Sequence, residues 1–121
     1  MYTIITYQYS DAGNNKQFEH IVLNGEVSAA DAATITATLE AETFFIPYDL
    51  KLGITELQSR QEDFPTDEDH VWHILNLDKR ETVATVPSGA AVIAVDDFVK
   101  AFVAVGHNGW DVSRAVDRLG V

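Results

Sequence analysis

The sequence of 121 residues contains no cysteine. Disulfide frameworks, zinc sites built from thiolates and cysteine nucleophiles are therefore excluded. A chain of this length fits one domain, residues 1–121, and can bury a hydrophobic core without a disulfide or a metal ion. With 46% hydrophobic and 22% charged residues, the composition is typical of a globular protein rather than a disordered one.

Long apolar runs are also missing. The longest, AAVIAV at 90–95, is far shorter than the roughly 20 residues that a membrane-spanning helix needs. The first residues, MYTIITYQYSD, have neither the basic segment nor the apolar segment of a secretory signal. We therefore expect a soluble, cytoplasmic protein that does not enter a membrane.

Basic residues are scarce: 8 lysines and arginines stand against 19 aspartates and glutamates, giving a net charge of −11 at pH 7. The imbalance is confined to residues 1–78, which hold 14 acids and three bases, whereas residues 79–121 hold five of each. Such a surface repels nucleic acid and anionic membranes and attracts basic partners. The alternative interpretation is that the acids simply keep the protein dispersed in water.

Two early segments predict a β-hairpin. YTIITYQY at 2–9 and QFEHIVL at 17–23 are rich in β-branched and aromatic residues, and the turn-forming SDAGNNK lies between them. SAADAATITATLEAE at 28–42 then predicts a helix that Ser28 caps. The next segment, 43–52, contains a proline, which predicts an edge strand or an irregular segment.

The second half of the chain predicts another hairpin and two helices. VWHILNL at 71–77 and ETVATV at 81–86 are strand-like and close enough to pair with each other. Residues 95–105 have apolar side chains at helical spacing, and Asp111 is placed to cap a short final helix. Together the elements predict an α+β domain: a small antiparallel sheet of about four or five strands that starts with the N-terminal hairpin, one helix after that hairpin, and a C-terminal helical hairpin.

The densest polar stretch is TDEDHVWHILNLD at 66–78. In a helix, His70 and His73 would share one face and could join a nearby aspartate in a metal site. In a strand that begins near His70, the two histidines would point to opposite faces and could not share an ion. Composition favours the strand, so we predict neither a metal ion nor another cofactor. A small metal-dependent hydrolase that uses His70 and His73 is kept as an alternative function.

The sequence contains no nucleophile elbow and no phosphate-binding loop, so we expect a protein that is not an enzyme. Our first hypothesis is an acidic protein that binds a basic protein surface. Phage or plasmid anti-defence proteins and nucleic-acid mimics that inhibit nucleic-acid-binding enzymes or toxins act in this way. The candidate contact residues are Glu40, Glu42, Glu62, Asp63, Asp67, Glu68, Asp69 and, as an aromatic anchor, Trp72. The alternative is a structural subunit of a larger, phage-like assembly, whose C-terminal helices pack on neighbouring subunits.

Overall fold

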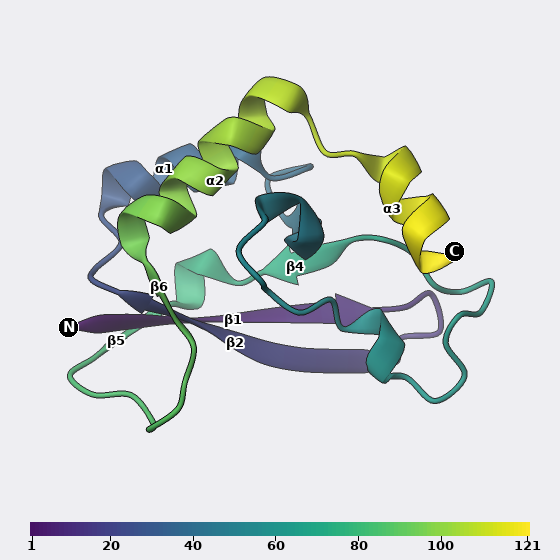
Figure 1. The fold of residues 1–121 in the computed structure, drawn as a ribbon, viewed down its shortest axis with the longest axis horizontal. Helices are drawn as coiled ribbons and strands as arrows, with labels where there is room; N and C mark the ends of the chain where they lie inside the picture. The colour runs from purple at the N-terminus through teal and green to yellow at the C-terminus, as the bar shows by residue number, and fades with distance from the viewer.

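A computed structural model describes all 121 residues of the chain. It contains six strands, three α-helices and three short 3-10 helices (Figure 1). In chain order they are β1 (Tyr2–Ser10), β2 (Lys16–Asn24), α1 (Ala29–Thr38), β3 (Phe44–Phe45), η1 (Pro47–Leu50), η2 (Gln58–Arg60), β4 (His73–Leu75), η3 (Leu77–Lys79), β5 (Glu81–Val83), β6 (Val92–Ala94), α2 (Val95–Asn108) and α3 (Val112–Leu119). The predicted α+β class is confirmed. None of the helices combines the length and the apolar character needed to cross a bilayer.

The N-terminal hairpin forms as predicted and is the centre of the sheet. β1 and β2 pair antiparallel along their whole length, from Tyr2 opposite Asn24 to Ser10 opposite Lys16. The strand order is β3-β4-β1-β2-β6, and β5 also pairs with β1. The prediction of a purely antiparallel sheet is wrong, because β6 runs parallel to β2. The apolar run at 90–95 supplies this strand, which leads directly into α2.

The predicted second hairpin is also wrong. β4 and β5 do not pair with each other, and each pairs antiparallel with a different part of β1. β4 lies beside Tyr7 and Gln8, whereas β5 lies beside the three residues from Tyr2 to Ile4. The short η3 helix between them moves the chain along the edge of β1 without reversing it, so the two strands follow one another on that edge.

Helix α1 begins as predicted and ends earlier than predicted. The Ser28 hydroxyl accepts a hydrogen bond from the Asp31 N–H at 3.0 Å, which caps the first turn. The helix ends at Thr38, and the chain then reverses in a tight turn in which Ala41 and Glu42 have φ of 50° and 59°. This turn brings the chain back into β3, so the predicted helical residues 40–42 are not helical.

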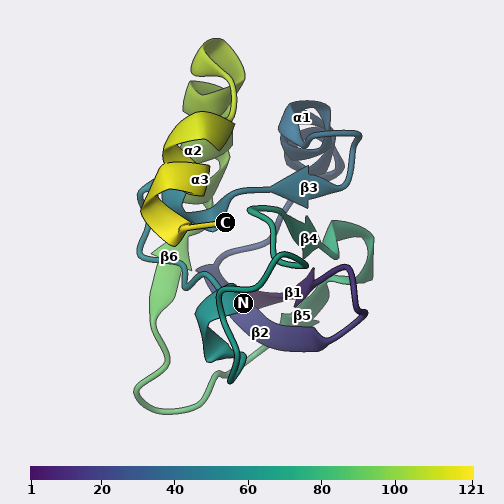
Figure 2. The same cartoon turned by 90° about the vertical axis from the view of Figure 1, so that its right-hand side faces the viewer.

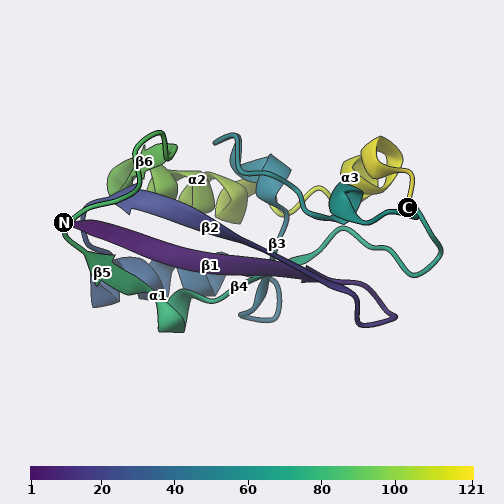
Figure 3. The same ribbon diagram turned by 90° about the horizontal axis from the view of Figure 1, so that it is seen from below.

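The two faces of the sheet differ. α1 and α2 pack side by side over one face (Figures 1 and 2), where they cover the odd-numbered side chains of β1, among them Ile5, Tyr7 and Tyr9. Phe98 and Phe102 of α2 are fully buried in this core. No helix covers the other face, which Figure 3 shows from below. The even-numbered residues of β1 lie on that face and are only partly buried.

The C-terminal helix is held by a cap and by an aromatic contact. The Asp111 carboxylate accepts the Arg114 N–H at 3.1 Å, as the sequence predicted for the start of α3. Trp110, just before it, packs against Phe102 and donates its indole N–H to the Thr38 carbonyl at 3.0 Å. These contacts fix the end of the chain to the end of α1.

Candidate functional site

A hollow of about 400 Å³ opens between the β1–β2 turn and the segment 60–69, which lie side by side at the right-hand end of the sheet in Figure 1. We call it the acidic hollow. Its lining is polar except for Phe64. The charged side chains that line it are five carboxylates and two cations: Asp11, Glu62, Asp63, Glu68, Asp69, Lys16 and Arg60. The surplus of carboxylates gives this concave surface a negative potential.

Asp69 fixes the segment 60–69 to the sheet. Its carboxylate accepts the Tyr9 hydroxyl at 2.5 Å and the Thr66 N–H at 2.8 Å. The Tyr9 oxygen in turn accepts the His70 N–H at 3.2 Å. Burial, and then the bond to Asp69, raise the pKa of Tyr9 well above its ordinary value, so the hydroxyl keeps its proton. Asp69 is therefore a structural acceptor as well as part of the hollow.

Replacing Tyr9 with phenylalanine removes this shared hydroxyl and is expected to lower the free energy of unfolding by about 1–2 kcal/mol. The amides of Thr66 and His70 should exchange their hydrogens faster, because both depend on the Tyr9–Asp69 pair. Tyr2→Phe is the control, since no hydrogen bond joins the Tyr2 hydroxyl to another residue. Equal amide protection in the two variants would show that Tyr9 does not hold the segment.

Asp11 is held on the other side of the hollow by the β1–β2 turn. It accepts the Asn15 side-chain amide at 3.0 Å and the Asn15 backbone N–H at 2.8 Å. These bonds, the side-chain one first, lower the pKa of Asp11 and keep it charged. The Ala12 N–H donates to the Glu68 carbonyl at 3.0 Å, which ties the turn to the acidic segment.

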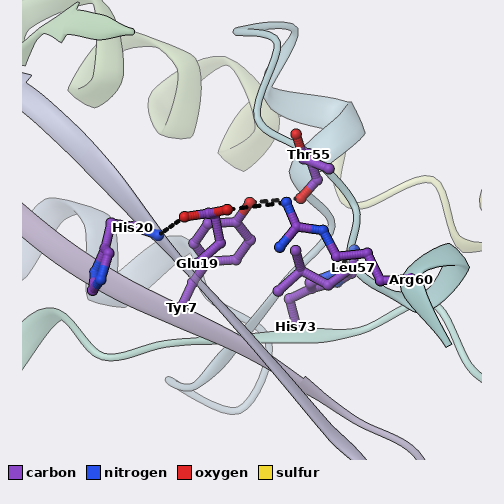
Figure 4. A network of polar contacts seen from close by, with 7 residues as sticks. All are labelled: Tyr7, Glu19, His20, Thr55, Leu57, Arg60 and His73. Atoms are coloured by element: carbon purple, nitrogen blue, oxygen red, sulfur yellow. Dashed lines mark hydrogen bonds and ion pairs between the residues drawn. The ribbon is translucent and has the colours of Figure 1, made fainter. Parts of the chain in front are cut away.

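Arg60 is the cation that reaches the hollow from η2, and it is already paired. Its guanidinium contacts the Glu19 carboxylate at 3.0 Å, and the same carboxylate accepts the His20 N–H at 2.9 Å (Figure 4). The backbone N–H of His20 and then Arg60 lower the pKa of Glu19. Tyr7 donates to the Thr55 carbonyl in the same network, which joins the segment before η2 to the sheet.

Three carboxylates of the hollow have no partner inside the protein. Glu62, Asp63 and Glu68 are exposed, and no hydrogen bond or ion pair reaches their carboxylates. Because Arg60 is paired with Glu19, Lys16 is the one unpaired cation of the lining. The free carboxylates are thus able to accept hydrogen bonds from a cationic group that enters from outside.

The structure places six of the eight predicted contact residues at two cavities and the other two at neither. Four of them line the acidic hollow: Glu62, Asp63, Glu68 and Asp69. Glu40 and Trp72 line a second cavity, of about 410 Å³, next to Trp110. Asp67 is exposed in the segment 60–69, and Glu42 is exposed in the turn after α1.

The aromatic candidate, Trp72, is partly buried rather than fully presented to solvent. Its ring lies 6.5 Å from that of Phe44 and 6.5 Å from that of Trp110. Trp72 therefore helps to join the edge of the sheet to the C-terminal segment.

The two histidines of the polar stretch lie against the same tyrosine. Strand β4 begins only at His73, and His70 precedes it in an irregular segment. The prediction of a strand that begins near His70 is therefore wrong, and both histidine rings contact Tyr9, at 4.9 and 5.5 Å between centroids. Their environments differ, because His70 is partly exposed and His73 is fully buried.

The acceptor nitrogen of each histidine is already occupied. His70 Nδ1 accepts the Trp72 N–H at 3.0 Å, which leaves its Nε2 as the donor to the Ser10 carbonyl at 2.7 Å. His73 Nε2 accepts the Leu57 N–H at 2.9 Å. No three histidine, aspartate or glutamate side chains lie together so that they could hold a metal ion. This geometry gives no support to the hydrolase alternative.

The sequence predicts the acidic segment 60–69 but not the β1–β2 turn that forms the opposite wall of the hollow. Asp11 with Asn15 four residues later is a visible turn pattern, but the pairing of this turn with residues 60–69 is a contact between distant parts of the chain.

Comparison of the chain with protein families, with curated proteins and with solved structures found no match.

Proposed function

We propose that the protein is not an enzyme and that it binds a basic surface of another protein through the acidic hollow. One observation carries this proposal: Glu62, Asp63 and Glu68 surround the hollow and have no cationic partner in the chain. A lysine or arginine of the partner would supply the missing charge. Charge-assisted hydrogen bonds to carboxylates are stronger than neutral ones, and arginine can make two in parallel.

The net charge of −11 extends this preference beyond the hollow itself. It favours approach of positively charged proteins and disfavours nucleic acid and anionic membranes. Electrostatic steering raises association rates at low ionic strength and is screened by salt. Binding to a basic partner should therefore weaken as the salt concentration rises.

In a narrower form of the proposal, the protein inhibits a nucleic-acid-binding protein. Mobile elements use inhibitors of this kind against host defences. A surface that binds phosphates offers the lysines and arginines that free carboxylates recognise. In that case duplex DNA or RNA and this protein should compete for the same partner. A partner that binds both at once would rule out the narrower form and leave the general one standing.

Neutralising the hollow should weaken its binding to a cationic probe. We expect Glu62→Gln, Asp63→Asn and Glu68→Gln together to reduce affinity for a hexa-arginine peptide about tenfold to 150-fold, because each exposed ion pair contributes roughly 0.5–1 kcal/mol. Titration calorimetry at low salt measures the affinity, and amide shifts in the NMR spectrum should map to residues 60–69.

The control is a second triple variant with the same change in net charge. Glu26→Gln, Asp78→Asn and Asp117→Asn remove three exposed acids outside the hollow, none of which forms a hydrogen bond or ion pair through its carboxylate. We expect the affinity of this variant to fall by no more than about threefold, because salt screens the interaction between the peptide and charges that lie far from the hollow. Equal losses in the two triples would mean that only net charge matters and would contradict the proposal.

A further inference from the structure

The cavity that Glu40 and Trp72 line differs in chemistry from the acidic hollow. Its volume is about 410 Å³, and it lies where the end of α1 and the residue before β4 meet the connection from α2 to α3 (Figure 1). Both tryptophans of the chain, Trp72 and Trp110, line it, and Glu40 is its single charged residue. We call it the tryptophan cavity. Aromatic rings beside one carboxylate are the groups that recognise organic cations.

The two indole rings meet at nearly a right angle and are held in place by other residues. Their centroids are 6.5 Å apart, and their planes are inclined by 80°. Trp110 donates its indole N–H to the Thr38 carbonyl at 3.0 Å and packs against Phe102, whereas Trp72 packs against Phe44. A cation between the two rings would lie within about 6 Å of both centroids, the range of a cation–π contact, for which tryptophan is the best aromatic partner.

Glu40 brings an unpaired negative charge to this cavity. The turn after α1 holds its backbone, because the Glu40 N–H donates to the Phe44 carbonyl at 2.8 Å and the Phe44 N–H donates back at 2.9 Å. The side chain is exposed, no hydrogen bond reaches its carboxylate, and neither of the two ion pairs of the chain includes it. No lysine, arginine or histidine lines the cavity. The carboxylate therefore has no cationic partner within the protein.

Elsewhere in the chain, the same combination of groups already holds an arginine. The Arg118 guanidinium lies 3.9 Å from the centroid of the Tyr48 ring. Its two terminal nitrogens donate to the two oxygens of the Glu56 carboxylate. One aromatic ring and one carboxylate thus bind this guanidinium. The tryptophan cavity has two aromatic rings and one carboxylate, and it lacks only the cation.

We propose that the tryptophan cavity binds an arginine side chain of a partner protein. The guanidinium lies against the indole rings and donates to the Glu40 carboxylate, and its aliphatic stem packs on Val112, which is 39% exposed at the start of α3. Arginine fits this site better than lysine, because a planar guanidinium stacks on aromatic rings and donates two parallel hydrogen bonds to one carboxylate. The cavity shares no lining residue with the acidic hollow, so arginine can bind here whether or not the hollow binds a basic partner.

Tryptophan fluorescence reports on this site alone, because both tryptophans of the chain line it. We expect the capped tripeptide Gly-Arg-Gly to change the emission of the wild type saturably, with a midpoint on the order of 1–10 mM at constant ionic strength. The same tripeptide with citrulline, which keeps the shape of arginine without its charge, should give no saturable change. Gly-Lys-Gly should bind at least about threefold more weakly than Gly-Arg-Gly.

Variants of the lining test the two kinds of contact separately. Glu40→Gln should weaken binding of the arginine tripeptide about fivefold, because it removes the charge and keeps the shape of the side chain. Glu42→Gln is the matched control: it removes an exposed acid of the same turn that does not line the cavity, and it should shift the midpoint less than about twofold. Trp72→Leu should also weaken binding about fivefold, followed through the indole N–H signal of Trp110 in the NMR spectrum. Thermal unfolding checks that each variant folds.

A further variant distinguishes this site from the acidic hollow. The combination of Glu62→Gln, Asp63→Asn and Glu68→Gln should leave the fluorescence response to the arginine tripeptide unchanged, because none of these residues lines the tryptophan cavity. Three results would overturn the proposal: no saturable response up to about 50 mM arginine tripeptide, an equal response to the citrulline tripeptide, or equal effects of Glu40→Gln and Glu42→Gln.

Discussion

Replacement of His73 by alanine is expected to lower the free energy of unfolding by about 3–5 kcal/mol. The side chain is fully buried, and its ring packs against those of Tyr9 at 5.5 Å and Phe45 at 6.0 Å. Its Nε2 accepts the Leu57 N–H at 2.9 Å. Alanine would leave a cavity and, in addition, a backbone N–H without an acceptor. Chemical denaturation at pH 7 measures the loss.

The same histidine predicts an acid-sensitive fold. Burial, more than any other cause, lowers the pKa of His73 to about 3, against 6.5 for a free histidine. In the unfolded chain His73 is therefore protonated below pH 6.5, whereas in the folded chain it stays neutral down to about pH 3. The stability that His73 contributes is complete above pH 6.5 and is lost as the pH falls towards 3. Between pH 6.5 and pH 5 this amounts to about 2 kcal/mol.

His73→Gln separates this titration from that of the carboxylates. Glutamine keeps a side-chain acceptor and cannot take up a proton, so the variant should be less stable at pH 7 but should lose less stability on acidification. The difference between wild type and variant, measured from pH 7 to pH 5, cancels the contribution of the acids. Parallel curves for the two proteins would show that His73 does not control the acid response.

Phe102→Ala is expected to cost about 4 kcal/mol of stability. Phe102 is fully buried and joins three parts of the fold: its ring lies 5.1 Å from Phe98, 6.3 Å from Phe45 and 6.1 Å from Trp110. Alanine would open a cavity where α2, the sheet and the C-terminal segment meet, and aromatic pairs contribute beyond their buried area. Thermal and chemical unfolding give the change in free energy.

The neighbouring residue provides the control for this prediction. Val103 stands next to Phe102 on the same helix and is 40% exposed. Val103→Ala should change the stability by no more than about 0.5 kcal/mol, and alanine favours the helix. If both variants lost the same amount, helix formation rather than the aromatic core would limit the stability of this protein.

The local features of the fold were predictable because neighbouring residues determine them. The β1–β2 hairpin followed from alternating apolar residues around a turn-forming segment, and the caps at Ser28 and Asp111 followed from the side chains alone. The early end of α1 was not predictable in this way. Ala41 and Glu42 adopt a left-handed conformation that the sequence favours weakly, and the pairing of β3 with β4 requires it.

The pairing of the later strands could not be predicted, because it depends on contacts between distant parts of the chain. The spacing of β4 and β5 predicts that they pair with each other as a hairpin. Instead both pair with β1, which lies more than 60 residues earlier in the chain. The three residues of β6 lie within an apolar run that carries no strand pattern of its own. Their parallel pairing with β2 makes the sheet mixed. Short strands of this kind are identified by their partners rather than by their own pattern.

The candidate site, like the fold, was predictable only in its local features. The acids at 62, 63, 67, 68 and 69 were visible as a charged run, but a run does not reveal whether it encloses a concave surface. The hollow forms because the β1–β2 turn supplies the opposite wall and Tyr9 holds Asp69. Glu40 and Trp72, chosen for charge and size, lie at another cavity.

The most direct test of the acidic hollow is a pull-down from a lysate of the source cells with three baits. These are the wild-type protein, the hollow triple variant (Glu62→Gln, Asp63→Asn, Glu68→Gln) and the control triple variant (Glu26→Gln, Asp78→Asn, Asp117→Asn), each used at low and high salt. We predict a basic protein that the wild type and the control triple retain at low salt, that high salt releases, and that the hollow triple does not retain. Retention of the same proteins by all three baits would contradict the account.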